Sequence, residues 1–362
     1  MKKLVSLTLA LLIALIALLP AMAEDVPTVR AGVLSMLNVT EDEMLRYWNA
    51  RSLVVRQLEK EGLVTHVFLQ EMSEAGIDES QMDVNIEIVY FDTLDAALMA
   101  LNAGKIDEIS IYGTVAQYLV HSDPNLVQAV TFNETADKNY FARFVRGGLM
   151  SNDFAFMFME DNAALRDEFD AALQSITEEE MEKLVQDNIT AAINGDEISP
   201  IQMPVIEGAE TIKVAVTGAL PPMDYVAADG TPAGFNTALL AEISKRMGKN
   251  IELVIVDSLG RAAALASGTV DAVFWTRTNA DSNERANSSE EEFNKRRETA
   301  EKDMSEEERE TMKKVSELIS FTEYGRADMP EGTIVTAPYF SDVAVPVTTQ
   351  ARLDEGAARA NQ

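Results

Sequence analysis

The residues best placed to contact a ligand follow the ends of expected strands in two parts of the chain. In the first part they are Ser35, Asn38, Tyr112 and Thr114, and in the second Met223, Asp224, Tyr225, Asp257, Trp275, Thr276, Arg277 and Thr278. A guanidinium can hold a carboxylate through paired hydrogen bonds, and aromatic rings can stack on a solute. For Trp275 and Tyr225 the alternative is core packing, and for Arg277 it is a surface charge. We take the set as a predicted binding site.

Residues for catalysis or metal binding are scarce. The chain has no Cys, which excludes a disulfide, a thiolate metal site and a cysteine nucleophile. Its two His, His66 and His121, are far apart, and neither has a second His at ligand spacing. A Gly-x-Ser-x-Gly nucleophile turn is also missing. We therefore expect no enzyme activity, no cofactor and no metal.

An internal repeat predicts the elements that position the candidate residues. Residues 85–107 read NIEIVYFDTLDAALMALNAGKID, and residues 250–271 read NIELVIVDSLGRAAALASGTVD. Both copies open with Asn-Ile-Glu, run apolar to an Asp, and end in a Gly followed by a β-branched residue and an Asp. Each copy predicts strand, helix and second strand, so two similar α/β units are expected. Strands that alternate with helices favour parallel sheets with right-handed crossovers.

This architecture explains why the candidate residues should meet. In open α/β sheets, ligands lie beyond the carboxyl ends of the strands, where helix N-termini also offer free backbone N–H groups. The stretches at that edge are 34–38, 92–93 and 112–114 in the first unit, and 217–225, 257–258 and 275–279 in the second.

The chain is divided by composition. Residues 1–23 have the two lysines, apolar run and Ala-Met-Ala site of a signal peptide; the alternative is an uncleaved anchor, for which the run is short. We expect a first unit at 24–195, a linker at 196–210 that contains two prolines, a second unit at 211–350, and a flexible tail at 351–362. The mature protein is expected to be exported, soluble and without stable membrane insertion, in the periplasm or outside the cell.

A charged helical insertion is expected at 283–320. Its acids and lysines recur four residues apart, as in Glu310 and Lys314, which supports exposed helix. We interpret it as a solvated surface excursion, with a partner-docking arm as the alternative. The whole chain carries a formal charge of −30, which argues against nucleic acid or an anionic membrane as partner.

The order of motifs in the second unit resembles a known family. A strand at 212–216 leads to Pro221-Pro222-Met223-Asp224-Tyr225, and then come Asp229-Gly230, Gly234-Phe235-Asn236, Ser267-Gly268-Thr269-Val270-Asp271 and Ala337-Pro338-Tyr339-Phe340. This order is similar to that of extracytoplasmic solute-binding proteins of ABC transporters, type II architecture, family 3 (the polar amino-acid branch). The first unit resembles the same family in its run from Asp92 to Phe158.

The resemblance implies a periplasmic-binding-protein-like II fold, a small polar solute such as an amino acid as ligand, and an ABC transporter permease as partner. In the family an Arg holds the ligand's α-carboxylate, and both Arg277 and Arg285 fit that role here; we favour Arg277 because it lies at a strand end. Met223 stands where the family usually has an aromatic residue, and Asn236 stands where it has an Asp. The alternative function is a protein of the same fold that acts as a ligand sensor or partner-docking scaffold.

By the resemblance, the elements of the family's second lobe would follow Val347, and they are not found there. Each unit instead holds about as many expected elements as one lobe of the family. Two arrangements therefore remain open: the two units form two lobes that share one cleft, or they are two reduced domains with separate sites.

Overall fold

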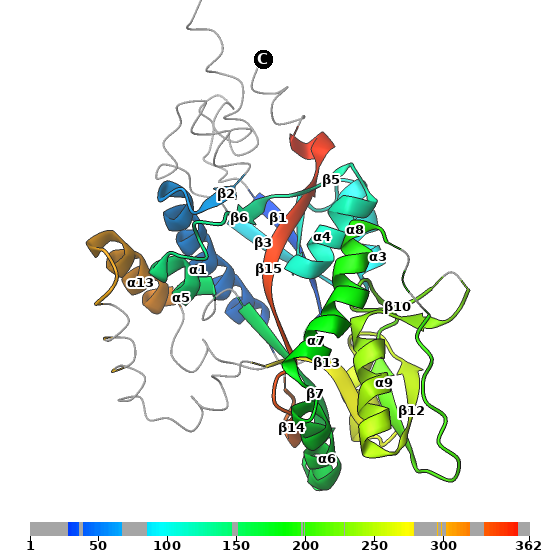
Figure 1. Cartoon of the computed structure of the whole chain (residues 1–362). Helices are drawn as coiled ribbons and strands as arrows, with labels where there is room; N and C mark the ends of the chain where they lie inside the picture. The colour runs from blue at the N-terminus through cyan, green and yellow to red at the C-terminus, as the bar shows by residue number, and fades with distance from the viewer. Residues whose placement is uncertain are drawn as a thin grey trace, which may run out of the picture.

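A mixed β-sheet runs through the described part of the molecule (Figure 1). The structure is a computed structural model, and it describes residues 28–35, 39–66, 85–146, 151–196, 198, 200–227, 229–278, 295, 298, 302–318 and 329–353. The main path through the sheet has the strand order β12-β8-β13-β7-β15-β4-β1-β3, with β14 beside β7 and β5 beside β15. The predicted α/β fold class is confirmed, but the sheet is mixed: its parallel pairings are those of β1 with β3 and β4 and of β8 with β12 and β13, and the others are antiparallel.

The two units have the same strand order. In the first, β1 (Thr28–Leu34) lies between β3 (Asn85–Phe91) and β4 (Glu108–Tyr112), and both pairings are parallel. In the second, β8 (Thr211–Val216) lies in the same way between β12 (Asn250–Ile255) and β13 (Ala272–Thr278). The helices that connect these strands are α1 (Glu41–Lys60), α3 (Leu94–Asn102), α9 (Phe235–Met247) and α10 (Gly260–Ala266).

The last Asp of each repeat copy has the same structural role. Asp107 accepts a hydrogen bond from the backbone N–H of Arg30 (2.9 Å), and its own N–H donates to the Arg30 carbonyl (2.8 Å). Asp271 makes the same pair of bonds with Lys213, at 2.8 Å each. Each Asp therefore fixes the register of its strand against the central strand of its unit, which explains why the repeat keeps it.

The two units exchange strands. β7 (Ser151–Met159) follows the first unit's parallel strands in the chain but pairs antiparallel with β13 and with β14 (Thr333–Val335). β15 (Phe340–Thr349) follows the second unit's strands but pairs with β4 and β5 (Leu126–Gln128). The two exchanged strands also pair with each other, from Phe340 opposite Phe154 to Val343 opposite Ser151. β7 and β15 are therefore the crossing pair that joins the two sheets.

The remaining elements cover the sheet or lie at its margins. α4 (Gly113–Ser122), α6 (Ala163–Gln174), α7 (Glu178–Val185), the π-helix η4 (Gln186–Thr190) and α8 (Ala191–Asn194) pack beside it, after the short 3-10 helix η3 (Glu160–Asn162). β2 (Val64–His66) pairs with β6 (Val130–Phe132), and α5 (Tyr140–Val145) follows β6 in the chain. A second small sheet is formed by β9 (Ala219–Leu220), β10 (Asp224–Val226) and β11 (Pro232–Ala233).

The insertion's described helix, α13 (Glu306–Leu318), packs on the first unit (Figure 1). Val315, 2% exposed, and Met304 join a hydrophobic cluster with Val54 and Leu58 of α1. Lys60 of α1 forms an ion pair with Glu307. The interpretation as a solvated surface excursion is therefore wrong for residues 304–318, because a helix of the second unit's insertion completes the first unit's core. Most of residues 283–301 lie outside the described part.

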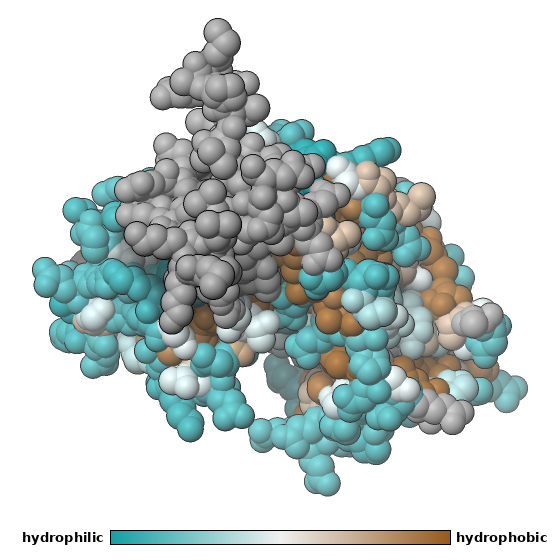
Figure 2. Space-filling view, turned by 90° about the horizontal axis from the view of Figure 1, so that it is seen from above, coloured by the Kyte–Doolittle hydropathy of each residue, from teal (hydrophilic) through white to brown (hydrophobic). Residues whose placement is uncertain are grey.

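Figure 2 shows hydrophilic residues over much of the described surface in that view, as the charge of −30 predicts, with hydrophobic residues gathered toward one side. Several large apolar side chains are exposed, among them Met99, Ile255 and Leu259. The helices found among the described residues include none that is long and apolar enough to cross a membrane.

Candidate functional site

One cavity is lined by both units at the carboxyl ends of their parallel strands. Its volume is about 60 Å³. The first unit contributes Ser35, Asp92 and Tyr112, and the second contributes Asp257, Arg261, Trp275 and Arg277, with further residues of both. The Ser258 hydroxyl donates to the Ser35 carbonyl (2.9 Å) and connects the two sides directly. Of the two arrangements left open by the sequence, the structure has the shared cleft.

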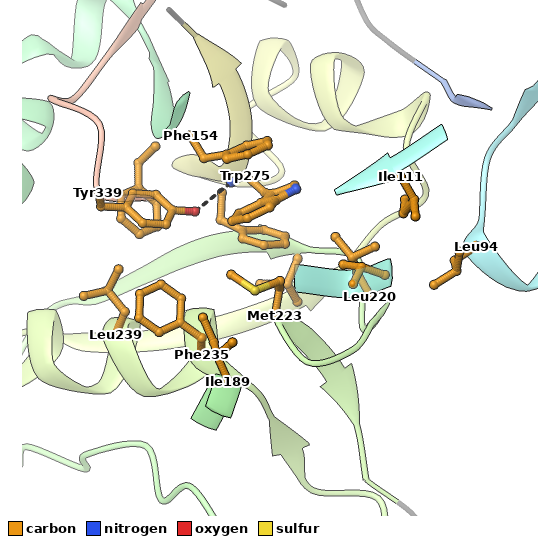
Figure 3. Close-up of a cluster of buried hydrophobic side chains, with 14 of the residues drawn as sticks. Leu94, Ile111, Phe154, Ile189, Leu220, Met223, Phe235, Leu239, Trp275 and Tyr339 are labelled. Atoms are coloured by element: carbon orange, nitrogen blue, oxygen red, sulfur yellow. Dashed lines mark hydrogen bonds between the residues drawn. The ribbon is translucent and has the colours of Figure 1, made fainter. Parts of the chain in front are cut away.

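Trp275 lines the cleft, and it lies beside Phe154 and Tyr339 in a cluster of buried hydrophobic side chains (Figure 3). Its ring stacks on Phe154, with centroids 3.6 Å apart and 6° between the planes, and Tyr112 meets it edge-on at 5.4 Å. Trp275 has a φ of 54°, a left-handed backbone conformation that residues other than Gly rarely adopt. The register of β13 against β7 shifts between Val273 and Thr276, so a β-bulge turns the Trp275 ring out of the regular strand alternation.

The backbone of Trp275 is held from two sides. Its N–H donates to the Tyr339 hydroxyl (3.2 Å), and its carbonyl accepts from the Arg261 guanidinium (3.2 Å). Burial raises the pKa of the Tyr339 hydroxyl well above its usual value, so the hydroxyl stays neutral. Within the described residues the indole Nε1–H of Trp275 has no hydrogen-bond partner, although this atom is buried. A buried donor without a partner is rare and can be satisfied by a ligand or water.

Charges of both signs line the cleft. Asp92 and Asp257 are exposed and occupy equivalent places in the repeat. Asp92 accepts from the Ser35 hydroxyl (2.9 Å), and Asp257 accepts from the Gly260 N–H (2.6 Å). Arg261 is buried and Arg277 is half-buried. Carboxylates beside guanidiniums can bind the ammonium and carboxylate of one zwitterion.

Asp224 does not line the cleft but fixes the position of a residue that does. One of its carboxylate oxygens accepts from the Thr217 N–H (2.7 Å), the Thr217 hydroxyl (2.8 Å) and the Gly218 N–H (2.7 Å). Burial raises the pKa of this carboxyl, and the three donors lower it in part. Since Thr217 lines the cavity, Asp224 fixes the position of a wall residue.

Five of the predicted residues come together here: Ser35, Tyr112, Asp257, Trp275 and Arg277. Six others do not line this cavity. Met223 packs in the core with Phe235 and Leu239 (Figure 3). Asp224 accepts a hydrogen bond from Thr217, and Tyr225 lies in the small sheet. Thr276 and Thr278 are buried along β13, and Thr114 donates its N–H to Asp342. Asn38 and the alternative Arg285 lie outside the described residues.

Sequence reasoning missed Arg261 and underrated Ser258. Arg261 follows Asp257 by four residues at the start of an Ala-rich helix, in SLGRAAALA. The sequence feature that could have indicated a site residue here is a single cation in an otherwise apolar stretch. Its guanidinium is buried, with Nε donating to the Ser258 carbonyl (3.2 Å). For a metal, the described residues offer no cluster of three or more His, Asp or Glu.

The comparison with protein families gave a match over part of the second unit. Residues 212–327 match bacterial extracellular solute-binding proteins, family 3. The predicted resemblance to extracytoplasmic solute-binding proteins is confirmed over this segment, which carries Trp275 and Arg277. The family is one of binding proteins and not of enzymes.

The comparison with curated protein sequences gave no match. Among solved structures, the ligand-binding component of an ABC-type import system from Staphylococcus aureus is 11% identical, with a TM-score of 0.35, over 92% of this chain and 71% of that chain. The aliphatic sulphonate-binding protein SsuA from Escherichia coli is 13% identical, with a TM-score of 0.30, over 92% and 68%. The lipoprotein Tp32 from Treponema pallidum is 10% identical, with a TM-score of 0.31, over 92% and 89%.

Proposed function

We propose that the protein captures a small zwitterionic solute, an amino acid or a close analogue, and delivers it to an ABC transporter permease. The observation that carries this proposal is a cleft between two units in which both units contribute carboxylates or aromatic rings and the second contributes two guanidiniums. A site that pairs with both charges of a zwitterion discriminates against solutes that carry only one of them, because such a solute loses one of the two sets of ion pairs.

The roles follow from the positions of the side chains. Arg277 and Arg261 receive the ligand's carboxylate, while Asp92 and Asp257 receive its ammonium. Trp275 supplies a flat apolar wall, and its indole N–H is a further donor to the ligand. The predicted ligand residues Ser35 and Tyr112 close the opposite side.

Ligand entry requires the units to separate. The cavity of about 60 Å³ is much smaller than the roughly 300–1,000 Å³ of typical ligand pockets. The Ser258–Ser35 hydrogen bond must break for the cleft to widen. β7 and β15 are the strands that cross between the units, so bending there opens the cleft in a hinge motion. Cleavage of a signal peptide at 1–23 would place the protein outside the cytoplasm, where it meets both solute and permease.

A thermal-shift screen of the chain from residue 24 tests this function. Each common amino acid is compared with the amine that lacks its carboxylate and the acid that lacks its ammonium. A ligand at 100 times its dissociation constant stabilises the protein by about 2.7 kcal/mol, which is easily seen as a rise in Tm. We expect a shift with at least one amino acid and a much smaller one with its two analogues. No shift with any amino acid would refute solute capture of this kind.

The second candidate is a ligand sensor or partner-docking scaffold of the same fold. The small volume of the cleft and the stacking of its wall residue Trp275 on Phe154 favour it. A partner-docking scaffold would show no response to amino acids, and Trp275→Ala would change only its stability. A ligand sensor would bind a solute but would not deliver it to a permease.

A further inference from the structure

A second cavity lies beside the cleft, between α1 and the sheet of the first unit. Its volume is about 40 Å³. Leu34, Tyr112 and Arg277 line both this cavity and the cleft, so these three side chains form the partition between the two spaces. Arg51, Ser110 and Asn152 are among the residues that line only the second cavity. A ligand held in the cleft by Arg277 therefore lies one side chain away from this space.

Arg51 is a buried cation that lines the second cavity. Its residue is 7% exposed, and burial lowers the pKa of the guanidinium. Within the described part of the chain, its side chain makes one hydrogen bond, from Nη1 to the Ser110 hydroxyl at 3.4 Å, and no ion pair. A guanidinium carries five N–H donors. Tyr47, which also lines this cavity, and Glu108 of β4 interact with Arg51 electrostatically. Arg51 can therefore donate to a further anionic partner in the cavity that it lines.

Glu108 is the carboxylate that faces Arg51 from β4. The attraction of Arg51 acts to lower the pKa of Glu108, but burial outweighs it and raises this pKa to about 7. At neutral pH Glu108 is therefore about half protonated, and it offsets only part of the Arg51 charge. The described residues that line the second cavity include two guanidiniums, Arg51 and Arg277, and no carboxylate.

We propose that this second cavity is an anion subsite, in which Arg51 receives a second acidic group of the solute bound in the cleft. The proposal rests on the proposed function and narrows it to acidic solutes, such as amino acids with a side-chain carboxylate. The ligand's zwitterionic end stays with Arg277 in the cleft, and its acidic side chain passes Tyr112 to reach Arg51. Tyr112 meets its neighbours by edge contacts, so it moves aside without breaking a stacked pair. The acidic group forms a charge-assisted hydrogen bond with the Arg51 guanidinium.

Isothermal titration of the chain from residue 24 with two matched ligand pairs tests the subsite. The pairs are glutamate with glutamine and aspartate with asparagine, which differ only in the acidic group. We expect one acid to bind at least about tenfold tighter than its amide, a difference of about 1.4 kcal/mol. Arg51→Met should remove most of this preference and leave the amide's affinity unchanged. The matched control is Arg56→Met on the same helix, whose side chain lines neither cavity, and it should keep the preference.

Arg51→Lys is a second variant that tests the subsite even if Arg51→Met fails to fold. It keeps the charge but loses the paired donors, so the acid's affinity should fall several-fold while the amide's stays the same. Equal affinity of the wild type for acid and amide would overturn the subsite and leave solute capture standing. An acid preference that survives Arg51→Met or Arg51→Lys unchanged would also overturn it. Absence of binding by every amino acid would overturn both proposals together.

Discussion

The Ser258 hydroxyl, at the end of the second unit's strand–helix turn, donates to the carbonyl of Ser35, at the end of the first unit's first strand, over 2.9 Å. These residues are 223 positions apart in the chain. The bond is buried and joins two residues that line the shared cleft, so it must break if the units separate to admit a ligand.

Ser258→Ala should shift the protein toward an open cleft. The loss of one buried hydrogen bond destabilises the closed arrangement by about 1 kcal/mol. The radius of gyration without ligand, measured by small-angle X-ray scattering, should rise, and added ligand should restore it. Ser267→Ala, which removes an exposed hydroxyl outside the cleft, is the control and should scatter like the wild type. A Ser258→Ala protein that scatters like the wild type would mean that this bond does not hold the cleft closed.

Glu108 should make the protein less stable as the pH rises. Burial raises its folded pKa to about 7 from the usual 4.5, so the folded state binds more protons than the unfolded state between these values. Stability is therefore highest below pH 4.5 for this group and falls as pH rises toward 7, by up to about 3 kcal/mol. Glu108→Gln should remove this decline in urea unfolding measured at several pH values. The exposed Glu252→Gln should retain it, and a wild type without the decline would contradict the prediction.

The α13 contact should contribute to the stability of the first unit. Val315→Ala removes buried methyl groups from the cluster with Val54 and Leu58 and should lower the free energy of unfolding by about 1–3 kcal/mol. Deletion of 283–320 should cost more, because it also uncovers one face of α1. Chemical denaturation measures both, with Val226→Ala at an exposed position as the control. An unchanged midpoint for Val315→Ala would argue against the packing of α13 on α1.

Asp224→Ala should weaken solute binding indirectly. The three donors that Asp224 accepts from hold Thr217 and Gly218, and their loss should cost about 2–3 kcal/mol of stability. Since Thr217 lines the cleft, affinity should fall too, whereas the exposed Asp229→Ala, which also removes a carboxylate bonded to a nearby Thr, should change neither. Titration calorimetry with the best solute from the thermal-shift screen separates the two effects.

The sequence by itself determined the local part of this protein. The repeat predicted strand, helix and strand in both units, and Asp107 and Asp271 confirm it by making the same bonds to the central strands. Five of the predicted ligand residues line one cavity, because the carboxyl ends of parallel strands meet at one edge, and their role in binding stays a prediction: Ser35, Tyr112, Asp257, Trp275 and Arg277.

Only the tertiary structure decided which distant segments pair. The exchange of β7 and β15 depends on hydrogen bonds between strands far apart in the chain, and an apolar strand has the same pattern whichever sheet it joins. Burial of Val315 against α1 is equally invisible in a helix whose other positions are mostly charged. Arg51 is the sharpest case: on a helix it resembles any surface cation, and only packing of α1 on the sheet places it in a cavity beside Arg277.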